Sequence, residues 1–403
     1  MNSKLLGGIL LVVGTTIGAG MLALPVATAQ LGFWGSLGLL IGCWSVMTAC
    51  AFLCLEVNLW LPPNSNLVSM AGATLGKAGQ VVTWVVYLVL LYSILSAYIA
   101  GGGDLFHYLL LTSGIAIPLS MASVIFTMVF GLIVYLGIRS VDYVNRGLMF
   151  GKMGALILLI ILISPFISSA NLNSGELKYF VHPTSMTVTA VAFGCLMIIP
   201  SLRTYFGNDV KTLRKAIFIG TLIPLICYIG WDMVIMGIIP LEGTPGLKKI
   251  LHSSSSSSDL VAALTSILQK DTVTLLAKFF TSICMATSFL SVSLSLSDFL
   301  SDGFSVKKEG VTGNAFIFSA TFGPPLGIVL FYPDAFLRGL QYAGISIFIL
   351  MILLPPLMVW GGRYHRGLAI DVNSYRVRGG KLLLALLVVF GTLMIGLGIE
   401  GAV

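Results

Sequence analysis

The chain has 403 residues, of which 57% are hydrophobic and only 9% carry a charge. Soluble domains carry roughly 25% charged residues, so this composition excludes an ordinary soluble protein and places most of the chain in lipid. The net charge of +7 could suggest an anionic partner such as nucleic acid. The basic residues instead gather in loops on one side of the predicted spans, so the charge reflects membrane topology and no nucleic-acid partner is expected.

Apolar stretches of about 20 residues, the length that crosses a hydrocarbon core, recur along the whole chain. We predict an all-α polytopic membrane protein of about eleven transmembrane helices, at 5–27, 34–57, 81–103, 119–138, 148–169, 186–206, 216–239, 272–301, 313–331, 335–359 and 382–401. All six cysteines fall within these spans without metal-ligand spacing, so no metal or cofactor is expected.

The positive-inside rule orients these spans. With the N-terminus in the cytoplasm, 16 of the 22 lysine and arginine residues lie on the cytoplasmic side. The others are Lys178, Lys248, Lys249, Lys270, Lys278 and Arg338. We therefore expect a cytoplasmic N-terminus and, after an odd number of spans, a periplasmic C-terminus. In the alternative, residues 1–29 form a signal peptide cleaved near Ala27-Thr28-Ala29, which leaves ten spans and puts the basic loops on the wrong side.

The first span contains GTTIGAGMLALP at residues 14–25, in which Gly14, Gly18, Gly20 and Pro25 interrupt an apolar run. Unwinding a helix in lipid frees backbone groups at a cost of several kcal/mol each, so a break persists only where a ligand, ion or water binds them. The alternative is that Gly14 and Gly18 form a GxxxG packing motif.

The sixth span contains AFGCLMIIPSL at 192–202, with Gly194 followed by Pro200. Spans 1 and 6 are both interrupted and are five spans apart, an odd offset that reverses the direction of crossing. Secondary transporters are often built from such inverted repeats, with the substrate site where the broken helices meet. We predict one repeat over 1–180, a second over 181–360, and a cytoplasmic loop with a peripheral span over 361–403. A simple kink in span 6 is the alternative.

The predicted break in span 1 suits a zwitterion. Its second half-helix presents N–H groups and a positive dipole end, and its first half presents carbonyl groups. A carboxylate beside an ammonium group matches both ends. Thr15 and Thr16 add hydroxyls, and Gly18 and Gly20 let a ligand approach the backbone.

Ionisable residues within spans are functional candidates. Lys152, near the inner end of span 5, either extends to the membrane interface or points inward between spans 1 and 8 as a fixed or titrating cation. The position of Asp232 in the outer third of span 7 favours a role on a polar face near an outer vestibule over a role as a proton relay. Asp104 and His107 in span 3 and Glu56 in span 2 are expected at the interfaces.

Span 8, SICMATSFLSVSLSLSDFL, is rich in serine, which suits hydroxyl ligands for a small cation, partners for Lys152, or simple helix packing. The serine run 253–258 is predicted to be a flexible loop. A short helix at 259–270, with Asp259 as its N-cap, is predicted to lie over the outer mouth. The polar, basic segment 361–381 is expected at the cytoplasmic leaflet.

Four motifs resemble the bacterial aromatic amino acid permeases, the tyrosine-specific transport proteins and their tryptophan relatives. They are GTTIGAGMLALP, AYIAGGG at 97–103, FGCLMIIPSLRTYFG at 193–207 and TSFLSVSLSLSDFLSD at 287–302. The resemblance implies an eleven-span fold of the amino acid–polyamine–organocation type, similar to LeuT, that imports an aromatic amino acid with protons across the bacterial inner membrane. The family more often has Gly-Phe-His-Gly-Asn in span 6 where this chain has the less polar Gly-Cys-Leu-Met-Ile, which leaves the substrate open.

The resemblance also implies site residues. Together with the Thr15 hydroxyl, the implied substrate-binding residues are Thr16, Gly18, Ala19, Gly20, Tyr98, Phe193, Gly194, Cys195 and Ser288. The implied coupling-ion residues are Lys152, Thr287 and Ser291. In some proton-coupled members of this fold a span 5 lysine replaces the sodium ion, and Lys152 matches it.

We therefore expect a secondary active transporter, not an enzyme, that imports an aromatic amino acid, tyrosine first, by proton symport with alternating access around helices 1 and 6. Tryptophan or another neutral amino acid, and sodium coupling, are the alternatives. A membrane-embedded enzyme would need clustered acids, histidines or metal ligands, whereas the 15 acidic residues and four histidines are scattered. A channel would need a continuous polar stripe.

Overall fold

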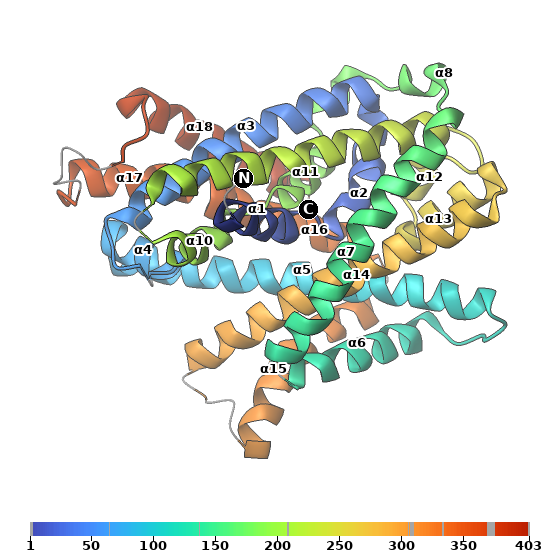
Figure 1. Cartoon of the computed structure of the whole chain (residues 1–403), viewed down its shortest axis with the longest axis horizontal. Coiled ribbons are helices and arrows are strands. Elements are labelled where there is room, and N and C mark those ends of the chain that lie inside the picture. The colour runs from blue at the N-terminus through green and yellow to red at the C-terminus, as the bar shows by residue number, and fades with distance from the viewer. Residues whose placement is uncertain are drawn as a thin grey trace.

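The computed structural model describes residues 3–63, 65–136, 138–207, 209–304, 306, 310–332, 334–368 and 375–401. Throughout these ranges the regular structure is helical (Figure 1). The helices are α1 (Ser3–Thr16), α2 (Gly20–Ala27), α3 (Gly32–Leu59), α4 (Leu67–Leu75), α5 (Lys77–Thr112), α6 (Leu119–Tyr135), α7 (Ile138–Ile163), α8 (Ser169–Leu172), α9 (Pro183–Ala192), α10 (Ile199–Phe206), α11 (Val210–Ile238), α12 (Leu247–Leu251), α13 (Ser256–Leu268), α14 (Asp271–Phe304), α15 (Gly310–Phe331), α16 (Ala335–Ile347), α17 (Leu354–Tyr364) and α18 (Gly380–Glu400).

The predicted class, an all-helical polytopic membrane protein, is confirmed. Among the described residues nine helical stretches are long and apolar enough to cross a membrane, and α1 with α2 would make a tenth as one bent span. The predicted fourth span corresponds to α6, which has only 17 residues. Two further spans are made of more than one α-helix. Between α9 and α10 lie three residues outside any helix, 193–195, and a short 3₁₀ turn, whereas a π-helical turn, Phe348–Leu353, joins α16 directly to α17.

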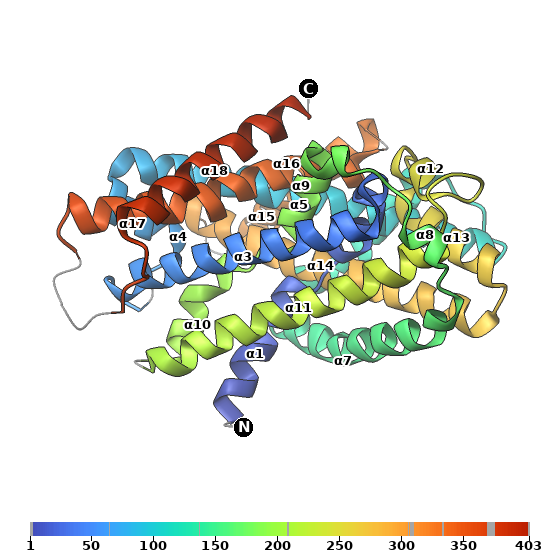
Figure 2. The ribbon, with the colours of Figure 1, turned by 90° about the horizontal axis from the view of Figure 1, so that it is seen from above.

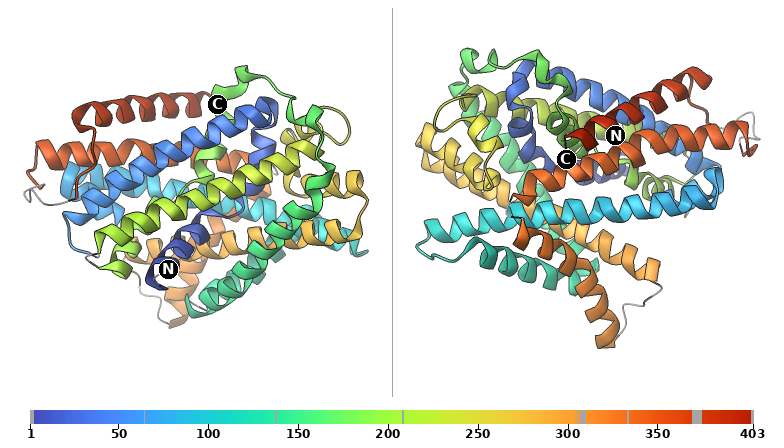
Figure 3. Two further views of the ribbon diagram at one scale, coloured as in Figure 1. Left: turned by 45° about the horizontal axis from the view of Figure 1, so that its top comes forward. Right: turned by 180° about the vertical axis from the view of Figure 1, so that it is seen from behind.

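The long helix α5 runs through the bundle and packs against α14, α16 and α6 (Figures 1 and 3). The second half of the first span, α2, is buried inside the bundle and packs against α9. The first half, α1, packs against α11 and leaves Leu6, Leu10 and Leu11 exposed. In contrast, α18 lies along the outer edge in Figure 2 and packs mainly against the span made of α16 and α17. Helix α18 therefore lies at the edge of the bundle.

The serine run is not a flexible loop, contrary to the prediction. Helix α13 begins at Ser256, inside the run, and its first three residues are buried. The backbone N–H and hydroxyl of Ser258 donate to the two carboxylate oxygens of Asp104 at 2.8 and 2.7 Å. Asp104 is thus buried inside the protein and His107 is half-buried, while their place at the membrane interface stays a prediction. Asp259 is not the N-cap; it lies in the first turn and accepts from the Ser253 hydroxyl.

Glu56, in the last turn of α3, is also buried inside the protein, and its place at the membrane interface stays a prediction. The Arg363 guanidinium donates to both of its carboxylate oxygens, at 2.7 and 2.6 Å, and the Val377 N–H donates to it at 2.7 Å. The segment around Val377 therefore packs onto the ends of α3 and α17. Of the predicted segment 361–381, residues 369–374 lie outside the described ranges.

Outside the spans, Asp209 caps the start of α11 by accepting from the Thr212 N–H at 3.1 Å. The Thr212 side chain and N–H both donate to this carboxylate, and these hydrogen bonds lower the pKa of Asp209. Nearby, the buried Arg203 donates to the backbone carbonyls of Asn58 and Leu61. These contacts fix the end of α10 against the end of α3.

Candidate functional site

The first span is broken where the glycines predicted it. Helix α1 ends at Thr16, α2 begins at Gly20, and the two axes differ by 55°. Within the turn, Met21 N–H donates to Gly18 O at 3.2 Å and Leu22 N–H to Ala19 O at 3.0 Å. The N–H groups of Gly18 and Gly20 donate to no other group in the part of the chain that the structure describes. Two backbone donors are therefore free at the break.

Side chains from three other spans hold this turn in place. The Tyr228 hydroxyl of α11 donates to Thr16 O at 2.7 Å, and the Lys152 ammonium of α7 donates to Ile17 O at 2.6 Å. On α14, the Ser288 hydroxyl accepts from the Ala19 N–H at 2.8 Å. Backbone groups that a regular helix would pair are thus bound by the surrounding bundle, as a break in lipid requires.

Gly18 is required by the approach of α14. A Cβ atom there would lie 2.7 Å from the Ser288 hydroxyl oxygen, closer than side chains tolerate. At Gly20 a Cβ atom would lie 3.6 Å from the nearest atom, the Ala192 Cα, which is ordinary contact. The two glycines therefore differ: the first leaves room for a hydroxyl, and the second lies beside the interrupted sixth span.

Lys152 points inward, so the alternative in which it extends to the interface is wrong. Its side chain is 1% exposed, and its ammonium group lies 3.4 Å from the Thr287 hydroxyl in addition to its bond with Ile17 O. It takes part in none of the ion pairs found among the described residues. Its ammonium group is therefore held by a backbone carbonyl at the break and has no counter-ion among the described residues.

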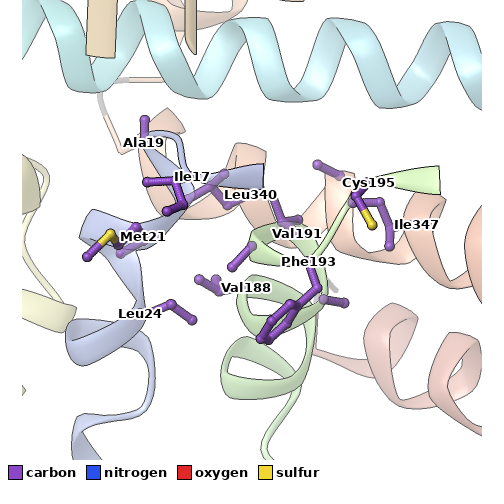
Figure 4. Packing of buried hydrophobic residues seen from close by; sticks show 14 of the residues in the cluster. Ile17, Ala19, Met21, Leu24, Val188, Val191, Phe193, Cys195, Leu340 and Ile347 are labelled. Atoms are coloured by element: carbon purple, nitrogen blue, oxygen red, sulfur yellow. The ribbon is translucent and has the colours of Figure 1, made fainter. Parts of the chain in front are cut away.

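The sixth span is interrupted beside the first. Helix α9 ends at Ala192, and Phe193, Gly194 and Cys195 precede the 3₁₀ turn that leads into α10. The Tyr228 hydroxyl lies 2.8 Å from Ala192 O, so one side chain reaches carbonyl groups at both interruptions. Figure 4 shows the two segments side by side, with Ile17 on one and Phe193 on the other.

A cavity of about 190 Å³ lies at these interruptions. The predicted residues that line it are Thr15, Thr16, Gly18, Gly20, Tyr98, Lys152, Gly194, Thr287, Ser288 and Ser291. Further polar lining comes from Asn145 and Ser295. The apolar wall includes Leu90, Leu91, Ile94, Val191, Ile347 and Met351. The lining of the cavity thus combines backbone and hydroxyl groups with large apolar side chains.

Three predicted residues do not line the cavity. Ala19 contributes to the site through its backbone N–H, which donates to the Ser288 hydroxyl. Phe193 packs edge-on against the Tyr228 ring, with 5.2 Å between centroids, and Cys195 is buried nearby. The hydroxyls of Thr15 and Thr16 donate to Val12 O at 2.9 and 2.7 Å, so only their lone pairs face a ligand.

Tyr228 was not predicted from the sequence. It is a single tyrosine in an apolar span, and no local motif marks it; only the fold brings its hydroxyl to both interruptions. The one available signal is helical periodicity, which places Tyr228 on the face of span 7 that carries Asp232, four residues later.

A second cavity, of about 170 Å³, adjoins the first on the side of α4 and α10. Tyr87 and Met197 line both cavities and separate them. On the opposite side of the break, α13 packs against α2, α5 and α14. The space at the break therefore extends toward the α10 end of the bundle and is covered at the α13 end.

The model of the tryptophan/tyrosine permease family matches residues 1–397. The tyrosine-specific transport system 1 of Haemophilus influenzae is 33% identical, over 97% of this chain and 96% of that protein. The tryptophan-specific transport protein of the same organism is 31% identical, over 98% and 95%. Glutamine transporter 2 of Aliivibrio fischeri is 32% identical, over 98% and 99%. The chain therefore belongs to the tryptophan/tyrosine permease family, and it is a multi-pass membrane transporter and not an enzyme.

Proposed function

We propose that this protein imports an aromatic amino acid, tyrosine first, across the bacterial inner membrane by proton symport. The observation that carries the proposal is the cavity at the break of the first span. Two glycines with free backbone N–H groups, Gly18 and Gly20, line this cavity together with large apolar side chains.

In this proposal the backbone binds the two charged groups of the amino acid. The carboxylate accepts from Gly18 and Gly20 at the start of α2, where the helix dipole also favours an anion. The ammonium group donates to carbonyl oxygens at the end of α9, where Val191, Ala192 and Gly194 line the cavity. No acidic side chain is needed at this position.

The proposed pocket for the side chain is the apolar wall from α5 and α16, formed by Leu90, Leu91, Ile94 and Ile347. Such a wall favours an aromatic ring over a charged side chain. Asn145 and Ser295 add polar groups to the lining and offer partners for a phenol hydroxyl. Tryptophan is the second candidate because the same wall suits an indole ring.

Lys152 is the proposed link to protons. As a cation, it forms a charge-assisted hydrogen bond with Ile17 O, and such bonds are stronger than neutral ones. Loss of the proton would weaken this contact and loosen the turn that carries the carboxylate site. Proton binding at Lys152 would thus favour the conformation that binds substrate.

We also propose that residues 1–180 and 181–360 are inverted repeats, with a cytoplasmic N-terminus and a periplasmic C-terminus. Packing between helices supports this pairing. If spans 1–5 correspond to spans 6–10, the contact of α7 with α14 corresponds to that of α16 with α5. Likewise, the contact of α5 with α6 corresponds to that of α14 with α15.

The test uses purified protein in liposomes with an inward proton gradient and no sodium. We expect accumulation of labelled tyrosine, and among unlabelled amino acids we expect the aromatic ones to compete best. Lys152→Ala should abolish accumulation, whereas Lys178→Ala, at an exposed lysine, should not. Uptake that requires sodium at constant pH would refute proton coupling, and stronger competition by glutamine than by any aromatic amino acid would refute the substrate class.

A further inference from the structure

We propose that Asp232 and Ser36 form a proton-binding site between α11 and α3, separate from the central cavity. This inference rests on the proposed proton symport and adds a second ionisable group to it. Its basis is a fully buried carboxyl group with one oxygen left unpaired.

The geometry of the pair is simple. Asp232 and Ser36 are both fully buried, and the Ser36 hydroxyl donates to Asp232 Oδ2 at 2.6 Å. The other oxygen, Oδ1, is buried and has no hydrogen-bond partner among the described residues. Neither residue lines the central cavity or the cavity beside it.

No positive group of the described residues compensates this carboxyl group. Helix α11 packs against α1, α2, α3, α7, α8 and α10 and the turn Ser164–Phe166. It also meets α9 through Tyr228 and α14 through the ring contact of Trp231 with Phe280. Of these, α2, α8, α9 and the turn have no ionisable residue. On α7, Lys152 is bound to Ile17 O, and the other ionisable residues of that helix precede Gly147. On α14, the nearest cation in sequence, Lys278, donates to the Thr112 hydroxyl of α5.

None of the remaining ionisable groups of these elements offers Asp232 a positive charge in the structure described. On α3, the cysteines are free and carry no positive charge in either protonation state, and Glu56 pairs with Arg363. Lys4 of α1 and Arg203 of α10 belong to the opposite end, where Arg203 binds carbonyls at the end of α3. On α11 itself, besides Cys227 and Tyr228, the ionisable residues Lys211, Arg214 and Lys215 lie in its first two turns.

A carboxylate in this place would be an uncompensated buried charge. Such a charge is strongly unfavourable, and one hydroxyl donor does not offset the loss of hydration. A proton added to Oδ1 forms an O–H bond and makes the group neutral, and an unpaired neutral hydroxyl is far less costly to bury. The neutral acid is therefore the form that fits the structure described.

The position of Asp232 connects this proton to the transport cycle. It lies four residues after Tyr228, whose hydroxyl reaches carbonyls at both interruptions, and α11 also packs against α2. In a conformation in which water reaches Asp232 from one side of the membrane, Oδ1 binds a proton. The proton stays bound when the protein closes and water no longer reaches the carboxyl group. For net symport, the same proton leaves to water on the other side in a later conformation.

The test compares the wild type with Asp232→Asn, which imitates the protonated acid, and with Asp334→Asn, a control at an exposed ion pair. Proton-driven accumulation is measured beside exchange of labelled for unlabelled tyrosine, which needs no net proton movement. A gradient of one pH unit supports roughly tenfold accumulation for each proton. We expect Asp232→Asn to keep exchange and to lose accumulation, whereas the control keeps both. Full accumulation by Asp232→Asn would overturn the proposal.

Infrared difference spectra between acidic and alkaline pH give a readout that needs no transport. We expect a protonated-carboxyl band in the wild type that is absent in Asp232→Asn and shifted in Ser36→Ala, which loses the hydrogen bond to Oδ2. A band unchanged in both variants would overturn the site. If the wild type shows this band but accumulates no aromatic amino acid, the proposed function fails while the proton site stands.

Discussion

Replacing Tyr228 by phenylalanine removes a hydroxyl that reaches both interrupted spans. This hydroxyl lies 2.7 Å from Thr16 O and 2.8 Å from Ala192 O. Because a hydroxyl has a single proton, the two carbonyl oxygens share it as acceptors. A buried carbonyl left without a partner costs about 1–3 kcal/mol, and each 1.4 kcal/mol is about a factor of ten in an equilibrium constant. If the turn that binds substrate depends on this contact, the Kd for tyrosine should rise about tenfold or more.

Tyr92→Phe is the matched control. Its hydroxyl also donates to a backbone carbonyl, Ala320 O at 2.7 Å, but this contact joins α5 to α15, and neither residue lines the central cavity. Both variants should lower thermal stability in detergent by similar amounts, since the phenyl ring of each remains. Isothermal titration with tyrosine should then show weaker binding only in Tyr228→Phe. Equal affinities in the two variants would refute the role given to Tyr228.

The other predictions concern the glycines and two buried carboxylates. Gly18→Ala should weaken tyrosine binding more than Gly20→Ala in the same titration, because the added methyl group meets the Ser288 hydroxyl at 2.7 Å; equal losses would contradict this. Asp104→Asn removes an acceptor that fixes the start of α13, so amide hydrogen exchange over residues 256–268 should accelerate, and unchanged exchange would count against the contact. Glu56→Gln leaves its buried arginine partner uncompensated, a change that costs about 3–5 kcal/mol in other proteins, and should lower the melting temperature markedly.

The interruption of the first span could be predicted because glycine and proline act locally. Glycine weakens a helix wherever it occurs, and Gly18 and Gly20 lie halfway through an apolar run, where an unwound backbone must find partners inside the protein. The inward direction of Lys152 was one of two alternatives, since a lysine near a helix end can extend to the interface. The Lys152 side chain points inward because its ammonium group binds the carbonyl oxygen of Ile17, which is free only because the first span is broken.

The surroundings of a polar group could not be predicted where its partner lies far along the chain. A run of serines has little apolar surface, yet Ser258 is ordered by Asp104, 154 positions earlier. Glu56 is buried because Arg363, 307 positions later, neutralises it. Tyr228 belongs to the same group, because its acceptors lie on two other spans. Local composition contains no information on such pairs.

A structure of the protein with bound tyrosine tests the central claim most directly. We predict that the carboxylate lies within hydrogen-bonding distance of the N–H groups of Gly18 and Gly20. The ring should pack against Leu90, Leu91 and Ile94 of α5. Tyrosine bound elsewhere, or bound in this cavity with its carboxylate away from the two glycines, would contradict the proposed site.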